Sequence, residues 1–246
     1  MVLQCEMEYA GGEALGGWLR SATLASLSEL NGECLELLAQ QARATPGSAL
    51  LAEIARLWLM LDAAARQRAA GCLYLLLDAG FAEPQHWRTF AAPQVEDADG
   101  GAYAPFFTVP VAAEVAQAVF TFAWHLARCQ SVAARLLLGM PAACVGELAL
   151  HTLGQVRTLA ARHPRWLRPR WSAHPDMWRQ FLRAAATGDA ATLERARLRG
   201  QTLLAAEARL PAPVRRARTL PGTPAGARCG APECAAEFVL AYAPGA

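Results

Sequence analysis

Residues 122–171, with the sequence FAWHLARCQSVAARLLLGMPAACVGELALHTLGQVRTLAARHPRWLRPRW, decide the fold. Apolar residues recur through the first part of this stretch at mostly three- and four-residue spacing, the pattern of a buried helical face. The residues that keep this spacing are Ala123, Leu126, Ala127, Val132, Leu136 and Leu137. The pattern predicts a long apolar helix followed by a short basic helix.

Residues that start and end helices divide the middle of the stretch. Gly139 can end one helix, because glycine takes the left-handed C-terminal position without a steric cost. Pro141 can start the next, because a first-turn proline loses no intrahelical hydrogen bond. Thr152 and Gln155 have the spacing of a capping box. We therefore expect a helix-turn-helix-like pair in which the second helix follows Thr152. The two predicted helices cover residues 142–149 and 153–162.

The same stretch resembles the FlhD family, the small all-helical subunit of the bacterial flagellar master transcriptional activator. The matching segments are Leu126-Ala127-Arg128, Ala133-Ala134-Arg135, Leu138-Gly139, Leu148-Ala149-Leu150, Thr152-Leu153-Gly154-Gln155 and Leu159-Ala160, with Leu193, Gly200 and Leu203-Leu204 near the family's last helix. The resemblance covers about residues 113–207. It implies a flagellar transcription regulator that binds a partner subunit and contacts DNA through the region after this core. The cysteine that joins two subunits in the family has no counterpart near Leu167, so that bridge does not carry over.

Alanine and leucine dominate the chain and β-branched residues are sparse, which favours helix almost everywhere. We expect an all-α fold with one short strand pair at the termini. Further helices are predicted over residues 22–44, 49–61, 63–78, 84–90, 175–186 and 190–210. The predicted regions are an acidic helical region at 1–90, a loop at 91–110, the FlhD-like region at 111–210, and a tail rich in Pro, Gly, Ala and Arg at 211–246.

The cellular compartment of the protein can be predicted from its apolar runs and its first residues. No apolar run has the roughly 18 uncharged residues of a membrane span. The first residues carry acids where a signal peptide carries basic residues. We expect a cytoplasmic protein with no membrane partner. The cysteines in apolar helical context are predicted to be reduced core residues: Cys34, Cys72, Cys129 and Cys144.

Charge is unevenly distributed along the chain. All 23 basic residues are arginine. Residues 1–110 hold 13 acids and 6 arginines, whereas residues 157–218 hold 14 arginines and 4 acids. This asymmetry predicts either a polyanionic partner for the basic half or docking of the two halves.

A run of arginines with tryptophans between them begins at the end of the second helix of the pair. Guanidinium groups suit phosphates and guanine, and aromatic rings offer stacking surfaces for bases. We predict one exposed basic face that binds DNA, formed by Arg162, Arg165, Arg168, Arg170, Arg179, Arg183, Arg195 and Arg199. The alternative is that these arginines pair with acids of residues 1–110 while the tryptophans fill the core.

No motif of enzyme chemistry stands out. A chain without lysine has no P-loop lysine and no Schiff-base lysine. The five histidines do not pair at helical spacing, and Cys229 with Cys234 make only half of a zinc site. We predict that the chain is not an enzyme and has neither a cofactor nor a metal site.

Two segments of the chain match each other at nearly constant offsets. Residues 38–41 match residues 126–129 at an offset of 88, and Leu61 with Arg68 matches Leu150 with Arg157 at 89. An aromatic segment follows in each half, at residues 81–87 and 166–171. A duplication predicts two similar helical halves that pack as a pseudo-dimer. Chance similarity of alanine- and leucine-rich helices is the alternative.

Two functions stay open at this point. The first is a transcriptional regulator resembling FlhD, with a protein partner or self-association and DNA as a candidate partner. The second is a helical interaction or scaffold protein that does not bind nucleic acid.

Overall fold

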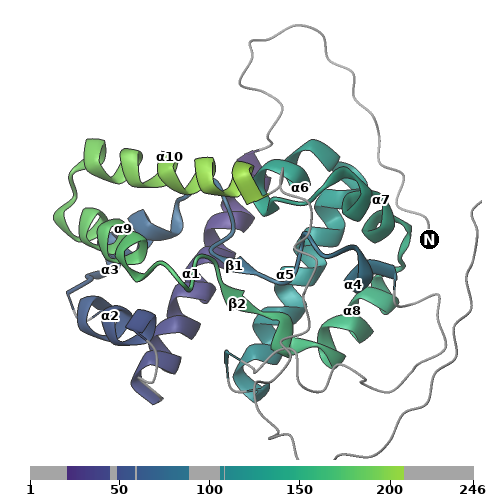
Figure 1. Cartoon of the computed structure of the whole chain (residues 1–246), viewed down its shortest axis with the longest axis horizontal. Helices are drawn as coiled ribbons and strands as arrows, with labels where there is room; N and C mark the ends of the chain where they lie inside the picture. Colours follow the sequence, from purple (N-terminus) through teal and green to yellow (C-terminus); the bar gives the residue numbers. More distant parts are fainter. Residues whose placement is uncertain (1–20, 45–48, 59, 89–105, 108, 208–246) are drawn as a thin grey trace, which may run out of the picture. The chain divides into compact units, whose positions relative to one another are not determined.

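The computed structural model describes residues 21–44, 49–58, 60–88, 106–107 and 109–207. These residues form helices almost throughout, and the all-α class is confirmed (Figure 1). They lie within one compact unit, Met1–Pro213. The predicted loop at 91–110 falls largely outside the described residues, and the tail at 211–246 falls outside them altogether.

The first half of the described chain consists of four helices and one short strand. In chain order they are α1 (Ser21–Ala44), α2 (Ala49–Trp58), α3 (Ala63–Ala70), β1 (Leu77–Asp78) and α4 (Pro84–Arg88). α1 is the longest, and both α2 and α3 pack against it. α2 ends three residues before its predicted end.

The second half has the same kinds of element with three additional helices. In chain order its elements are α5 (Val109–Cys129), α6 (Ser131–Leu138), α7 (Ala142–Leu150), α8 (Leu153–Arg162), the 3-10 helix η1 (Pro164–Trp166), β2 (Arg168–Pro169), α9 (Pro175–Thr187) and α10 (Ala190–Glu207). The additional helices are α6, η1 and α10. α6, α7 and α8 all pack against α5.

The predicted helix-turn-helix-like pair is confirmed as α7 and α8. The Thr152 side chain accepts from the backbone N–H of Gln155 at 3.3 Å, and the Gln155 side chain accepts from the Thr152 N–H at 2.8 Å. These reciprocal bonds satisfy N–H groups that a helix start leaves unpaired. Gly139 follows α6 in the left-handed conformation, with φ 67°.

The prediction of a helix over residues 63–78 is wrong beyond Ala70. The chain turns away after α3 because the buried Asn31 side chain binds the segment that follows. Its amide donates to Tyr74 O at 3.0 Å, and its oxygen accepts from Leu76 N at 2.9 Å. These bonds fix residues 74–76, which lead directly into β1.

The strand pair of the described residues lies well inside the chain, whereas the termini, where the sequence predicts a strand pair, fall outside the described residues. β1 and β2 are antiparallel, with Leu77 opposite Pro169 and Asp78 opposite Arg168. The predicted apolar patch near the C-terminus, at residues 237–242, falls outside the described residues. The pair is short, but it joins the two halves directly.

A single hydrophobic core runs through both halves. Leu38 of α1 and Leu126 of α5, matched at the offset of 88, are both fully buried in it. Residues before and after the segment at 91–110 contribute to this same core. Two residues of the predicted buried face are exposed instead, Val132 at 56% and Leu136 at 51%.

The halves repeat each other element by element, which supports the predicted duplication. At the offset of 88, the buried Leu35, Leu38 and Ala39 of α1 match the buried Ala123, Leu126 and Ala127 of α5. α3 and α8 follow N-cap residues 90 positions apart, Asp62 and Thr152. Each cap side chain accepts from the backbone N–H three residues later.

The strand pair has the register that a two-fold axis requires. At an offset of 91, Leu77 corresponds to Arg168 and Asp78 corresponds to Pro169. In the sheet Leu77 pairs with Pro169, and Asp78 pairs with Arg168. Each residue thus pairs with the counterpart of the residue next to it, as two-fold symmetry requires. The same offset relates two residues that share a left-handed backbone, Gly80 with φ 69° and Trp171 with φ 51°.

The helix that follows the strand in each half, α4 or α9, carries one shared pattern. A proline in the first turn is followed three residues later by tryptophan and arginine: Pro84, Trp87 and Arg88 in α4, and Pro175, Trp178 and Arg179 in α9. Each indole donates to a carbonyl of the preceding loop, Trp87 to Phe81 O at 3.3 Å and Trp178 to Arg170 O at 2.8 Å. The offset of 91 thus holds through these helices.

Each half covers part of the other with the helix that follows its strand. α4 packs on α7, whereas α9 packs on α2 and α3 (Figure 1). The matched arginines make matched ion pairs across the halves, Arg88 with Glu147 at 3.3 Å and Arg179 with Glu53 at 2.9 Å. This is the arrangement of two subunits that exchange a terminal element, contained here in one chain.

Candidate functional site

Arg170 is a buried structural residue, which corrects its placement on an exposed basic face. Its side chain is 4% exposed, and its guanidinium donates to Leu75 O at 2.7 Å and to Leu138 O at 2.6 Å. Asp78 and Glu207 lie at 3.9 and 3.6 Å. The five donors of arginine suit this role, because one side chain reaches carbonyls of separate segments.

The tryptophans of the basic run belong to the core, as the alternative interpretation holds. Trp166 is 8% exposed and its ring lies between two imidazoles, with centroids 3.9 Å from His86 and 4.1 Å from His163. Trp171 is equally buried and packs edge-on against Tyr74. Neither ring offers a face for stacking with bases.

The remaining predicted arginines separate into two groups. Arg162 is exposed at the end of α8, and Arg165 and Arg168 follow it half-buried. The others lie on α9 and α10, which pack against each other. There Arg179 is bound by Glu53, while Arg183 is exposed. The members on α10, Arg195 and Arg199, are exposed and bond to Thr192 and Gln180.

The two groups differ in net charge. Residues 153–170 contain five arginines and no acid, counting the buried Arg170. α9 and α10 contain five arginines and three acids, among them Glu194, which pairs with Arg197 at 3.6 Å. The strongly positive character predicted for residues 157–218 therefore belongs, among the described residues, mainly to α8 and the segment after it.

The helix-turn-helix-like pair is a property of the fold in both halves. α2 and α3 match α7 and α8 in order and in the capped start of the second helix. Both pairs pack on the long helix of their own half, and α7 also lies under α4. The pair alone therefore does not indicate DNA binding. Only its second helix, α8, presents an exposed face that carries Arg157 and Arg162.

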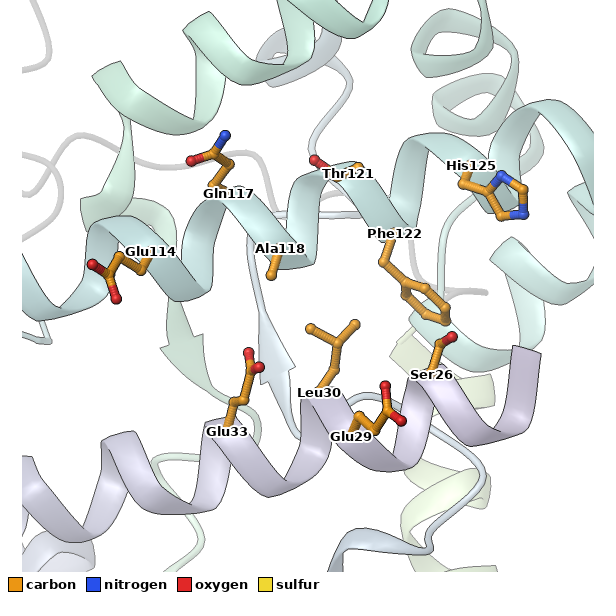
Figure 2. A pocket seen from close by; sticks show the side chains of 10 residues that line it. All are labelled: Ser26, Glu29, Leu30, Glu33, Glu114, Gln117, Ala118, Thr121, Phe122 and His125. Carbon is orange, nitrogen blue, oxygen red and sulfur yellow. The ribbon is translucent and has the colours of Figure 1, made fainter. Parts of the chain in front are cut away.

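An open groove runs between the two long helices, α1 and α5. It encloses about 490 Å³. Figure 2 shows Leu30 of α1 pointing towards Ala118 and Phe122 of α5, so that these three side chains form an apolar floor. Leu30 and Phe122 are buried, and Ala118 is half-buried.

Acidic and polar side chains border this apolar floor. Three exposed carboxylates line it, Glu29 and Glu33 from α1 and Glu114 from α5. Among the described residues, no basic side chain pairs with any of the three. The groove therefore combines an apolar surface with uncompensated negative charge. The sequence of α1 alone does not single out Glu33, since only the fold shows that α5 lies opposite.

The cysteines have the environment of structural residues, with one exception. Cys34, Cys72 and Cys144 are buried as predicted, whereas Cys129 is exposed. Burial raises the pKa of Cys72 to about 12 and that of Cys144 to about 11. Such thiols stay protonated at neutral pH and are poor nucleophiles. Among the described residues, no cluster of three His, Cys, Asp or Glu side chains has the geometry to hold a metal ion.

A search for membrane spans in the described part of the chain identifies no helix of sufficient length and apolar character.

Comparisons with protein-family models, with curated proteins and with solved structures identify no match to this chain. The resemblance to the FlhD family therefore stays a prediction from the sequence.

Proposed function

We propose that this chain is a helical interaction protein that acts by binding another protein. The groove between α1 and α5 carries this proposal, because it is open, apolar along its floor, and bordered by carboxylates without partners in the described chain. A groove with an apolar floor and a few polar groups at its border is the usual form of a binding site. The arginines that the first prediction assigned to DNA support the proposal as well, since Arg170 and Arg179 are bound within the molecule.

Filling the groove tests this function. Ala118→Phe places a ring on the floor, and Ala143→Phe is the matched control on the exposed surface of α7. Tagged full-length protein is purified from its native cell, and partners are identified by mass spectrometry. We expect a partner that the unmodified protein and the control retain and that Ala118→Phe loses, with all three proteins melting at similar temperatures. A partner profile that is the same for all three rejects the groove as the binding surface.

A second candidate is transcription regulation through DNA, as the FlhD resemblance implies. One observation favours it: α8 has exposed arginines at Arg157 and Arg162 and no acid. Phosphate contacts release counterions, so affinity for DNA should fall steeply with salt. Replacing both arginines with alanine should flatten the salt slope by about 2 units. The control is the double variant Arg183→Ala/Arg195→Ala on α9 and α10. A chain that DNA-cellulose does not retain even at low salt eliminates this candidate.

A further inference from the structure

The groove has the dimensions of a site for a helix. Its α5 wall extends from Glu114 to His125, and eleven helical steps of about 1.5 Å give about 16 Å. This length matches three turns of a guest helix. In Figure 2 the labelled residues of α1 and α5 increase in opposite directions, so the walls are two antiparallel helices with side chains of both pointing into the space between them.

The walls favour a helical guest over an extended one. Both are α-helices, whose backbone N–H and C=O groups bond within each helix. An extended peptide would therefore find no strand edge to pair with and would bring its own unpaired backbone groups onto Leu30 and Phe122. A helix satisfies its backbone internally and can place apolar side chains on the same floor.

The charge of the lining determines the polar face of the guest. The charged lining residues are Glu29, Glu33 and Glu114, and neither wall contributes an arginine to the groove. An acidic helix or a nucleic acid would meet these uncompensated negative charges. Arginine or lysine at the border of a guest helix would instead pair with the carboxylates and speed its association.

We propose that this groove binds one amphipathic helix of a partner protein, with apolar residues facing Leu30, Ala118 and Phe122 and basic residues facing the three glutamates. This inference rests on the proposed function, because it names the partner that the protein-binding surface takes. Recognition of this kind uses apolar anchors at three- and four-residue spacing.

The duplication limits the site to one guest. The axis that relates the halves passes through the groove, because four pairs of lining residues stand at the offset of 88. These pairs are Ser26 with Glu114, Glu29 with Gln117, Leu30 with Ala118, and Glu33 with Thr121. A groove on a two-fold axis has room for one helix per chain. The paired residues differ in charge, so the two orientations of that helix differ in energy.

Site-specific photo-crosslinking in the native cell tests the inference. A photoreactive residue replaces Gln117, which is exposed at the border of the groove, and a second version places it at Arg183 on α9 as the control. We expect the crosslinked peptide at position 117 to come from another protein and to carry apolar residues at helical spacing beside arginine or lysine. A crosslink to an acidic segment, to a second copy or to this chain's own residues 208–246 overturns the proposal.

Charge neutralisation then tests the role of the glutamates with the crosslinked partner segment as a labelled synthetic peptide. Glu29→Gln/Glu33→Gln should weaken its binding by about fivefold, because exposed ion pairs contribute modestly. Glu36→Gln, on the same helix but paired with Arg43, is the control and should leave affinity unchanged. Equal affinity for the double variant and the unmodified protein overturns the charge assignment. A partner that co-purifies but crosslinks only at position 183 refutes the groove while leaving the protein-binding function standing.

Discussion

The first and second halves share their architecture and differ in their surfaces. Each half has a long helix, a pair of helices with a capped second member, and a short strand. In each, the helix after the strand packs on the other half. Only the second half has α6, and only its strand leads to a buried arginine, since Arg170 matches the fully buried Ala79 at the offset of 91. Features that both halves share are required by the fold. Features that only one half has are the candidates for function or for added stability.

This distinction changes the interpretation of the helix-turn-helix-like pair. α7 and α8 alone resemble a DNA-binding unit, but α2 and α3 repeat them at matched positions. The features that one half has alone are the exposed Val132 and Leu136 of α6 and the unequal charges at matched groove positions.

Arg170→Ala should have the largest effect on stability and tests whether the second half depends on its buried arginine. Removing the guanidinium leaves the carbonyls of Leu75 and Leu138 buried without their donor, at a cost of about 3–5 kcal/mol in free energy of unfolding. Urea denaturation measures it. The control Arg183→Ala, at an exposed position, should stay within about 0.5 kcal/mol. Equal losses for the two variants would contradict the role assigned to Arg170.

Gly80→Ala tests the left-handed position that both halves share. The added Cβ would clash with the His86 imidazole in a conformation already unfavourable for alanine, so we expect a loss of about 2 kcal/mol or more. Gly146→Ala is the control, because nothing lies near its added Cβ within α7, and it should stabilise by about 0.5–1 kcal/mol. A neutral Gly80→Ala would show that the turn into α4 rearranges freely.

The two helix caps test whether the halves are equivalent in energy as well as in geometry. Asp62→Ala and Thr152→Ala each remove the side chain that accepts from the third N–H of the following helix, so each should cost about 1 kcal/mol. Thermal or urea unfolding of both variants gives the comparison. Thr158→Ala, within α8 and exposed, controls for the loss of a threonine. If the two cap variants differ widely, the repeat is one of shape alone.

Acid should weaken the contact between α9 and α2, the smallest effect expected here. Hydrogen bonds from Arg179 and Arg56 lower the pKa of Glu53 from 4.5 to about 2. Because the pKa of Glu53 is lowered in the folded state, its carboxylate stabilises the fold above about pH 4.5. This stabilisation is lost as the pH falls towards 2. Glu53→Gln should therefore show a shallower loss of stability across that range. Glu147→Gln should change less, since Glu147 has a single ion pair with Arg88. Parallel acid titrations of the three proteins check this.

The parts of the fold that depend on nearby residues could be predicted from the sequence. The limits of α8 follow from Thr152 and Gln155, and the end of α6 from Gly139, because caps act over three or four residues. The strand at residues 77–78 could not be predicted in this way. Its partner lies 91 residues further along, and the turn before it depends on the Asn31 side chain.

The candidate site was less predictable than the fold. Sequence reasoning treated the arginines as one group, but burial of Arg170 depends on where the carbonyls of Leu75 and Leu138 come to lie. The proline, tryptophan and arginine shared by α4 and α9 give the offset of 91 directly from the sequence. Matching the aromatic segments at residues 81–87 and 166–171 does not give this offset. The groove needed the fold, because α1 alone does not show that α5 lies opposite.

The exchange of α4 and α9 sets an order of events on the ribosome. Synthesis proceeds from the N-terminus, so α2 and α3 are complete more than 100 residues before α9, whose first residue is Pro175. Until α9 is made, the apolar surface of α2 and α3 that it covers in the folded protein stays without this partner. α4 likewise waits for α7. The first half therefore cannot finish folding as it emerges, and a nascent chain stalled before residue 175 would expose an unfinished surface to chaperones.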